Sequence, residues 1–333
     1  MTVVTSEKEA TKRLTYVDIA KGIGIFLVVV GHCIPDATSS TGISIGFYRW
    51  LHDVIYSFHM PLFFFLSGFM VSRKKMVNSG YKPIDILYKR GLRLLIPYIF
   101  VGLCYAPFKM LLSKFANKPY DISTIWQIFI GINPDGELWF LYSLFIVTVI
   151  AALFSFRVSV LGLVVSILLL IWNPWGIVTK YIFFFLLGIY IRYNMTYGDF
   201  IQGLTYKHII VVGLFLLIGL YGLIIMKWNP CFLITATSGI VLTLWFSFQL
   251  SHLHSFISNV LEQWGILSMD IYVLSDIIKI PFRIIFWNKL HFYTFSFVIC
   301  IIFSMLLSIL ISKYIIQKNK ILKFLVFGIK TNR

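Results

Sequence analysis

Long apolar runs constrain the fold of this chain of 333 residues more than any other feature. Hydrophobic residues make up 59% of the chain and charged residues only 13%, whereas soluble domains carry about 25% charged residues. The backbone of a run that crosses lipid must satisfy its own hydrogen bonds, which favours α-helices. We therefore predict an all-α polytopic membrane protein. Its helices, about ten at roughly 20 residues for a full crossing, are expected at residues 16–34, 50–71, 93–113, 138–156, 158–172, 177–191, 208–226, 231–250, 265–287 and 293–312.

The Lys and Arg residues between these runs predict an orientation. With a cytoplasmic N-terminus, the cytoplasmic segments would hold nineteen of the 29 Lys and Arg residues and the outer segments seven. Cytoplasmic loops of membrane proteins carry such an excess. We therefore expect both termini in the cytoplasm and a single domain over residues 1–333, with a polar tail at 1–15 and a basic tail at 313–333. Since the net charge of +16 lies mainly in these loops, it indicates contact with lipid headgroups and not with nucleic acid.

Two ionisable residues, Lys21 and His32, lie inside the first apolar run. An ionisable residue is costly inside a membrane helix and indicates a functional site. Their α-carbons would lie ~16 Å apart along the helix axis, about half the thickness of the hydrocarbon core. In the predicted orientation Lys21 is in the inner half of the helix and His32 is near its outer end. Asp18 precedes Lys21 by three residues, so simple neutralisation of the pair is the plainer interpretation of Asp18.

The second apolar run places His52, Tyr56 and His59 on one helix face. Pro61 is expected to kink this helix. A neutral imidazole accepts a proton from a hydroxyl group and returns it to a leaving group near neutral pH. The alternative for each histidine is a buried ring that is hydrogen-bonded across helices. Two histidines together with Lys21 on adjacent helices favour the catalytic interpretation.

Arg90 and Arg93 precede the third run at a spacing of three residues. Guanidinium groups bind phosphate oxygens in a two-pronged geometry. Ordinary anchoring by positive charge at the cytoplasmic face explains the same residues, and the spacing alone favours that explanation.

Glu137 and Trp139 open the fourth run at its outer end. Glu137 is suited to orient a sugar or a histidine, and Trp139 to stack on the face of a sugar. The alternative is an aromatic residue at the membrane interface beside a solvated acid. In the ninth run Asp276, Lys279 and Arg283 form one charged stripe, most simply an internally paired ion network.

The four cysteines are far apart in the chain and lack the spacing of a zinc site, so we expect no metal.

Together these motifs resemble the membrane acyltransferase-3 family, and most closely its fucose 4-O-acetylase-like branch. The family pattern of a basic residue followed ten residues later by His is similar to Lys21 and His32. Further similar elements are Tyr56–Phe69, with its His-Met-Pro-Leu-Phe-Phe-Phe-Leu-Ser-Gly sequence, the Arg-x-x-Arg of Arg90 and Arg93, and Leu138–Leu141. The chain departs from the family at Lys21, where many members have Arg, and at Ser275, where His is usual.

The resemblance implies a multi-pass acyltransferase of the bacterial plasma membrane. It implies acetyl-CoA or another acyl-CoA as donor, and as acceptor a sugar hydroxyl of a cell-surface glycan or of its lipid-linked precursor. By the same resemblance His32 is catalytic, Lys21 is essential beside it, and Arg90 and Arg93 bind the nucleotide end of CoA. We expect His59 to assist His32.

Ser67 and Tyr56 are candidate donors to the oxyanion. The rival interpretation is a transporter or flippase for a glycan precursor, although the two related halves typical of transporters are not evident.

Overall fold

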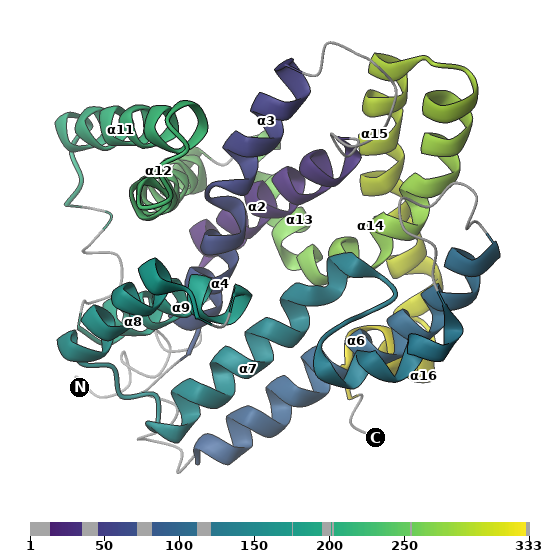
Figure 1. Cartoon of the computed structure of the whole chain (residues 1–333), viewed down its shortest axis with the longest axis horizontal. Coiled ribbons are helices and arrows are strands. Elements are labelled where there is room, and N and C mark those ends of the chain that lie inside the picture. Colours follow the sequence, from purple (N-terminus) through teal and green to yellow (C-terminus); the bar gives the residue numbers. More distant parts are fainter. Residues whose placement is uncertain are drawn as a thin grey trace, which may run out of the picture.

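The computed structural model describes residues 14–34, 46–71, 82–111, 121–174, 176–194, 201, 203–253 and 255–330. Within these residues the fold consists of helices and contains no strand, which confirms the predicted all-α class (Figure 1). Residues 1–13 of the predicted N-terminal tail and the basic residues Arg73, Lys74 and Lys75 lie outside the described residues.

Every one of the ten predicted ranges overlaps a helix. Six stretches are long and apolar enough to cross a membrane, namely Thr15–Cys33, Pro83–Leu111, Gly136–Leu153, Tyr206–Ile225, Cys231–Leu253 and Tyr293–Ile316. The number of ten crossing helices and the side on which the termini lie stay predictions. The helices are α2 (Thr15–Cys33), α3 (Gly46–Tyr56), α4 (His59–Phe69), α6 (Pro83–Leu111), η2 (Ile122–Ile130), η3 (Gly136–Leu138), α7 (Trp139–Leu153), α8 (Val160–Trp172), α9 (Ile177–Asn194), α11 (Tyr206–Leu220) with η4 (Tyr221–Ile225), α12 (Cys231–Leu253), α13 (Phe256–Ile266), α14 (Ser268–Phe282) with η5 (Arg283–Lys289), α15 (Tyr293–Ile311) with η6 (Ser312–Ile316), and α16 (Lys320–Phe327).

The second predicted run forms two separate helices and is not a single helix kinked at Pro61. α3 ends at Tyr56 and α4 begins at His59, with a turn at Ser57 and Phe58 between them. The Ser57 hydroxyl donates to the carbonyl oxygen of Val54 at 2.7 Å, and such local bonds compete with the helical ladder. Pro61 lies in the first turn of α4, where a missing N–H costs nothing. The break changes the direction of the chain between α3 and α4, so His52 and His59 do not lie on one continuous helix.

α13 is a helix that the hydropathy pattern did not predict, and it packs along α2. A Cβ atom on Gly22 would collide with the carbonyl oxygen of Leu261, and one on Gly265 with that of Asp18. The two backbones therefore touch directly, as membrane helices do where small residues meet. This contact fixes the half of α2 that carries Asp18 and Lys21.

The segment predicted as a basic tail, 313–333, is largely helical over its described part. α15 continues through η6 to Ile316, and α16 packs against α6 with Phe327 fully buried. Gly328 has a left-handed φ of 64° and lies so close to the carbonyl oxygen of Leu92 that a side chain would not fit. The end of the described chain therefore folds back onto the helix that carries Arg90 and Arg93.

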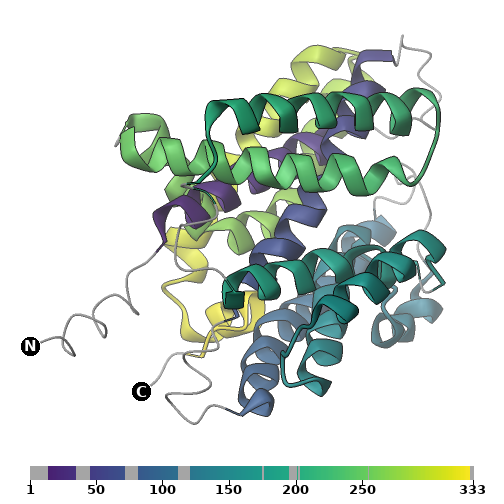
Figure 2. The same ribbon diagram turned by 90° about the vertical axis from the view of Figure 1, so that its left-hand side faces the viewer.

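α2 lies at the centre of the fold and contacts α3, α4, α12, α13, α14 and α15. α6 and α7 run alongside each other below it in Figure 1, and α4 packs on α9. Figure 2 shows α11 and α12 side by side as a separate pair, and most large side chains of α11 are exposed, as expected for a helix in contact with lipid. The polar side chains described next lie in the interior between α2, α4, α6, α7 and α14.

Candidate active site

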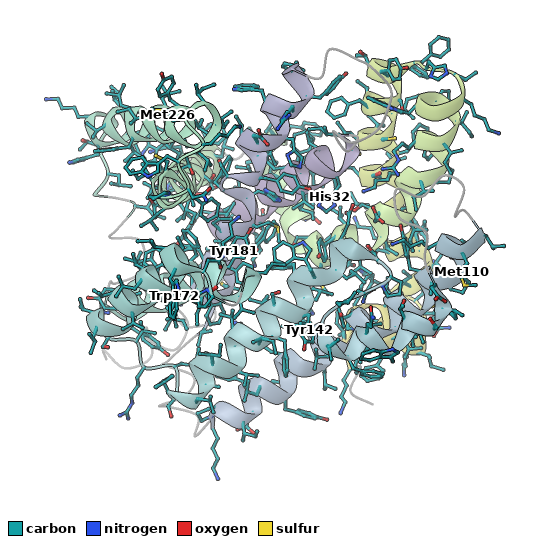
Figure 3. The ribbon with its side chains drawn as sticks, viewed as in Figure 1. His32, Met110, Tyr142, Trp172, Tyr181 and Met226 are labelled. Carbon is teal, nitrogen blue, oxygen red and sulfur yellow. The ribbon has the colours of Figure 1, made fainter. Side chains whose placement is uncertain are left out.

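His32 contacts the carboxylate of Glu137. The imidazole lies in the last turn of α2, and its Nδ1 contacts Oε2 of Glu137. Glu137 is in the short turn η3, where its backbone N–H donates to Oδ1 of Asp135 at 3.0 Å. Figure 3 labels His32 where α2 approaches α14 and α15. Of the two predicted partners of Glu137, a histidine and a sugar, the structure supplies the histidine.

A buried lysine holds the other oxygen of Glu137. Nζ of Lys279 lies 2.5 Å from Oε1 of Glu137 and also pairs with Asp276. The hydroxyl of Tyr105, from α6, donates to Asp276 at 2.9 Å. The predicted internal pairing of Asp276 with Lys279 is therefore present. The sequence interpretation missed its continuation to His32, because Glu137 and Lys279 are far apart in the chain.

His59 is fully buried at the start of α4, and its Nδ1 lies 2.7 Å from the carbonyl oxygen of Ile55. A carbonyl only accepts, so Nδ1 carries the proton and Nε2 has a free lone pair. Nε2 has no hydrogen-bond partner among the described residues. The ring of Tyr56 lies 4.7 Å from that of His59 and 6.3 Å from that of His32, centroid to centroid. The structure thus brings both predicted histidines next to one tyrosine.

A cavity of about 400 Å³ extends along α2, on the Lys21 side of His32. Asp18, Lys21, Ile25 and Val28 line it from α2, over about 15 Å of helix at 1.5 Å per residue. His32 follows Val28 by one turn on the same face. The remaining walls are mainly apolar and include Met60, Phe63, Leu66, Leu94, Phe140, Leu141, Leu144, Ile266 and Met269.

Arg90 and Arg93 line this cavity together with Lys21. Arg90 donates to the carbonyl oxygen of Ser67 at 2.7 Å and to Oγ1 of Thr148 at 3.2 Å. No carboxylate contacts Arg90 in the described part of the chain, so neutral oxygens hold a guanidinium whose charge is available to an anion. Nζ of Lys21 lies 3.2 Å from Oδ1 of Asp18, which is the expected neutralising pair.

Ser67 lies at the Arg90 side of the cavity, eight residues after His59 in α4, and thus about 12 Å further along the helix. This position places Ser67 with Arg90 and separates it from the histidines. The Trp139 ring stacks on Tyr181 with the centroids 5.5 Å apart, so one of its faces is covered by protein.

Tyr272 is a site residue that the sequence interpretation missed. Its ring lines the cavity, and its hydroxyl donates to the backbone carbonyl of Glu137. It thereby joins the cavity to the turn that carries the partner of His32. A single tyrosine in an apolar helix carries no signal of such a role.

Within the described residues no group of three or more His, Cys, Asp and Glu side chains is arranged to hold a metal ion. The donors at this site are instead paired with each other and with a lysine. The arrangement is suited to moving a proton at His32, with anion-binding groups at the far end of an apolar cavity.

Comparison with known proteins agrees with this arrangement. A family described as an acyltransferase domain matches residues 14–313. Nodulation protein NolL from Mesorhizobium japonicum is 29% identical over 133 residues, which are 39% of this chain and 32% of that protein. The chain therefore spans about a third of the length of that relative. No solved structure matches the chain.

Proposed function

This chain belongs to the acyltransferase-3 family, and on that premise we propose that it moves an acyl group, acetyl in the simplest case, from cytoplasmic acyl-CoA to a sugar hydroxyl. The acceptor in this proposal is a cell-surface or exported polysaccharide or its lipid-linked precursor. The observation that carries the proposal is the cavity. Cationic side chains line one end, and at the other end lies Tyr272, whose hydroxyl contacts the turn that carries Glu137.

The donor fits the cavity by its chemistry. The phosphates of CoA would pair with Arg90 and Arg93, since guanidinium groups bind phosphate oxygens in a two-pronged geometry. Lys21 would face the same anions from α2. The thin, largely apolar pantetheine arm would then lie between α2 and α4 and bring the thioester toward His32. In the predicted orientation this donor end would face the cytoplasm, where acyl-CoA is made.

His32 would act as the general base. Nε2 takes the proton of the acceptor hydroxyl, whose oxygen attacks the thioester carbon. The carbon–sulfur bond then breaks, and the CoA thiolate receives the proton from His32. Glu137 accepts the Nδ1–H bond and stabilises the imidazolium that forms between these steps. Transfer by way of an acyl-histidine would use the same residues.

The oxyanion of the tetrahedral intermediate needs a hydrogen-bond donor. Tyr56 is closer to His32 than Ser67 is and is the better candidate, whereas the hydroxyl proton of Tyr272 is already donated to the carbonyl of Glu137. His59 would support the site through its free Nε2, as a second acceptor next to Tyr56.

The purified protein in detergent tests the proposal directly. With acetyl-CoA and the polysaccharide of the producing cell, we expect release of free CoA and new O-acetyl signals in the NMR spectrum of the polysaccharide. Release of no CoA under conditions in which the protein is folded would contradict acyl transfer. If cells lacking the protein kept the O-acetyl groups but failed to export the glycan, the flippase alternative would hold.

A further inference from the structure

Lys279 occupies a position that the acyl-transfer mechanism does not use directly. Its side chain is 5% exposed, yet its ammonium group contacts two carboxylates, those of Glu137 and Asp276. A buried charge without partners is costly, so these contacts explain how the residue is tolerated. They do not explain why a lysine is there, because apolar side chains of similar volume pack as well as a buried ion pair.

We propose that Lys279 is a positioning residue that acts on His32 through Glu137; this inference rests on the proposed function. The two carboxylate oxygens of Glu137 have different partners, because Oε2 contacts His32 and Oε1 contacts Lys279. A carboxylate on a turn of three residues, with 28% of the side chain exposed, has few contacts to fix its rotation. The contact with Lys279 fixes the rotation of the carboxylate, so that Oε2 stays in contact with Nδ1 of His32.

Lys279 is itself held in place by residues of α14 and α6. Asp276 holds its ammonium group from one turn earlier in α14, and the hydroxyl of Tyr105 in α6 holds Asp276. The backbone of Glu137 is held separately, at its N–H by Asp135 and at its carbonyl by Tyr272. α14 thus holds Glu137 at two points, at the backbone carbonyl through Tyr272 and at the side chain through Lys279.

Charge supports the same role. Glu137 and Asp276 supply two carboxylates against the one ammonium of Lys279. A proton on His32 places a positive charge against the carboxylate of Glu137, and that is the state His32 adopts after it takes the hydroxyl proton. Without Lys279, two carboxylates would face each other in a buried site, and Glu137 would lose both its orientation and its counter-charge.

The test compares Lys279→Met, Lys279→Arg and the control Lys289→Met, which removes an exposed cation at the end of η5. Initial rates of CoA release are measured at varied acetyl-CoA. We expect Lys279→Met to lower kcat on the order of 10²-fold and to leave KM for acetyl-CoA within about twofold. Lys279→Arg should restore most of kcat, and Lys289→Met should behave as wild type.

Equal kcat in Lys279→Met and wild type would overturn the inference. A merely structural ion pair would be indicated by loss of folded protein in Lys279→Met together with unchanged kcat in the remainder, and that result would also overturn it. If Lys279→Met does not reach the membrane, the charge-neutral pair Lys279→Met with Asp276→Asn takes its place, with the same expected loss of kcat and the same contradicting result. Wild-type protein that releases no CoA would overturn the proposed function and, with it, this inference.

Discussion

At the scale of single residues, the chemistry depends on how Glu137 divides its two carboxylate oxygens. One oxygen contacts His32 and the other contacts Lys279. The first contact fixes which imidazole nitrogen is free to act as a base, because Nδ1 is then the donor. The importance of Lys21 and His32 could be predicted from the cost of ionisable residues inside an apolar helix. Spacing also predicted the pairing of Asp18 with Lys21, and Glu137 was a candidate to orient a histidine. The link from Glu137 to Lys279 could not be predicted, because the two residues are far apart in the chain.

Replacing Glu137 by Gln should lower kcat on the order of 10²–10³-fold, because the amide cannot stabilise the imidazolium as a carboxylate does. KM for acyl-CoA should stay unchanged, since Glu137 lies outside the cavity lining. Steady-state rates of CoA release check both values. A variant that kept wild-type kcat would show that His32 works without this partner.

Replacing Arg90 by Ala should raise KM for acyl-CoA about tenfold or more, because a charge-assisted bond to phosphate contributes about 1.5–3 kcal/mol. Arg90→Lys should recover little, since a lysine lacks the planar fork. The exposed Arg157, which is also on the predicted cytoplasmic side, provides the control as Arg157→Ala. Equal KM values for Arg90→Ala and wild type would place the nucleotide end of the donor elsewhere.

At the scale of helices, direct backbone contacts set the geometry of the site. α2 touches α13 through Gly22 and Gly265, and this contact holds the end of α2 that carries Asp18 and Lys21. Apolar runs predicted the long helices well, because length and hydropathy are local properties. The break at Ser57 and Phe58 and the docking of α13 and α16 depend on neighbouring helices, so the hydropathy pattern carried no signal of them.

Replacing Gly265 by Val should destabilise the protein by about 1–3 kcal/mol, since the new side chain would collide with the backbone of α2. Gly213 in α11 provides the matched control, because a Cβ added there meets no atom within 4 Å. Gly213→Ala should leave the stability unchanged or slightly raised. Thermal unfolding in detergent checks the difference, and equal unfolding temperatures for Gly265→Val and wild type would contradict the close contact.

At the scale of the whole molecule, the site connects two ends of a helical bundle. Arg90, Arg93 and Lys21 lie at one end of the cavity. At the other end, the hydroxyl of Tyr272 contacts the turn that carries Glu137. Lys and Arg counts predict that the cationic end faces the cytoplasm. The structure adds that α16 docks on α6 beside Arg93, so the end of the described chain should lie on the same side as the donor.

Labelling with a membrane-impermeant maleimide tests this orientation. In a background with the exposed Cys104 replaced by Ser, Lys320→Cys should be protected in intact cells and should react after lysis. Asp121→Cys, in the predicted outer segment before η2, should react in intact cells. The reverse pattern would invert the predicted topology and separate the cationic end of the cavity from cytoplasmic acyl-CoA.

The most direct measurement follows the acyl group itself through His32. Inside-out membrane vesicles that contain the polysaccharide acceptor are given acetyl-CoA with a radiolabelled acetyl group, and the label in the polysaccharide is counted. We expect wild-type vesicles to transfer the label and vesicles with His32→Ala, at the same level of protein, to transfer none above background. Equal labelling of the polysaccharide by His32→Ala and wild type would contradict acyl transfer at this site.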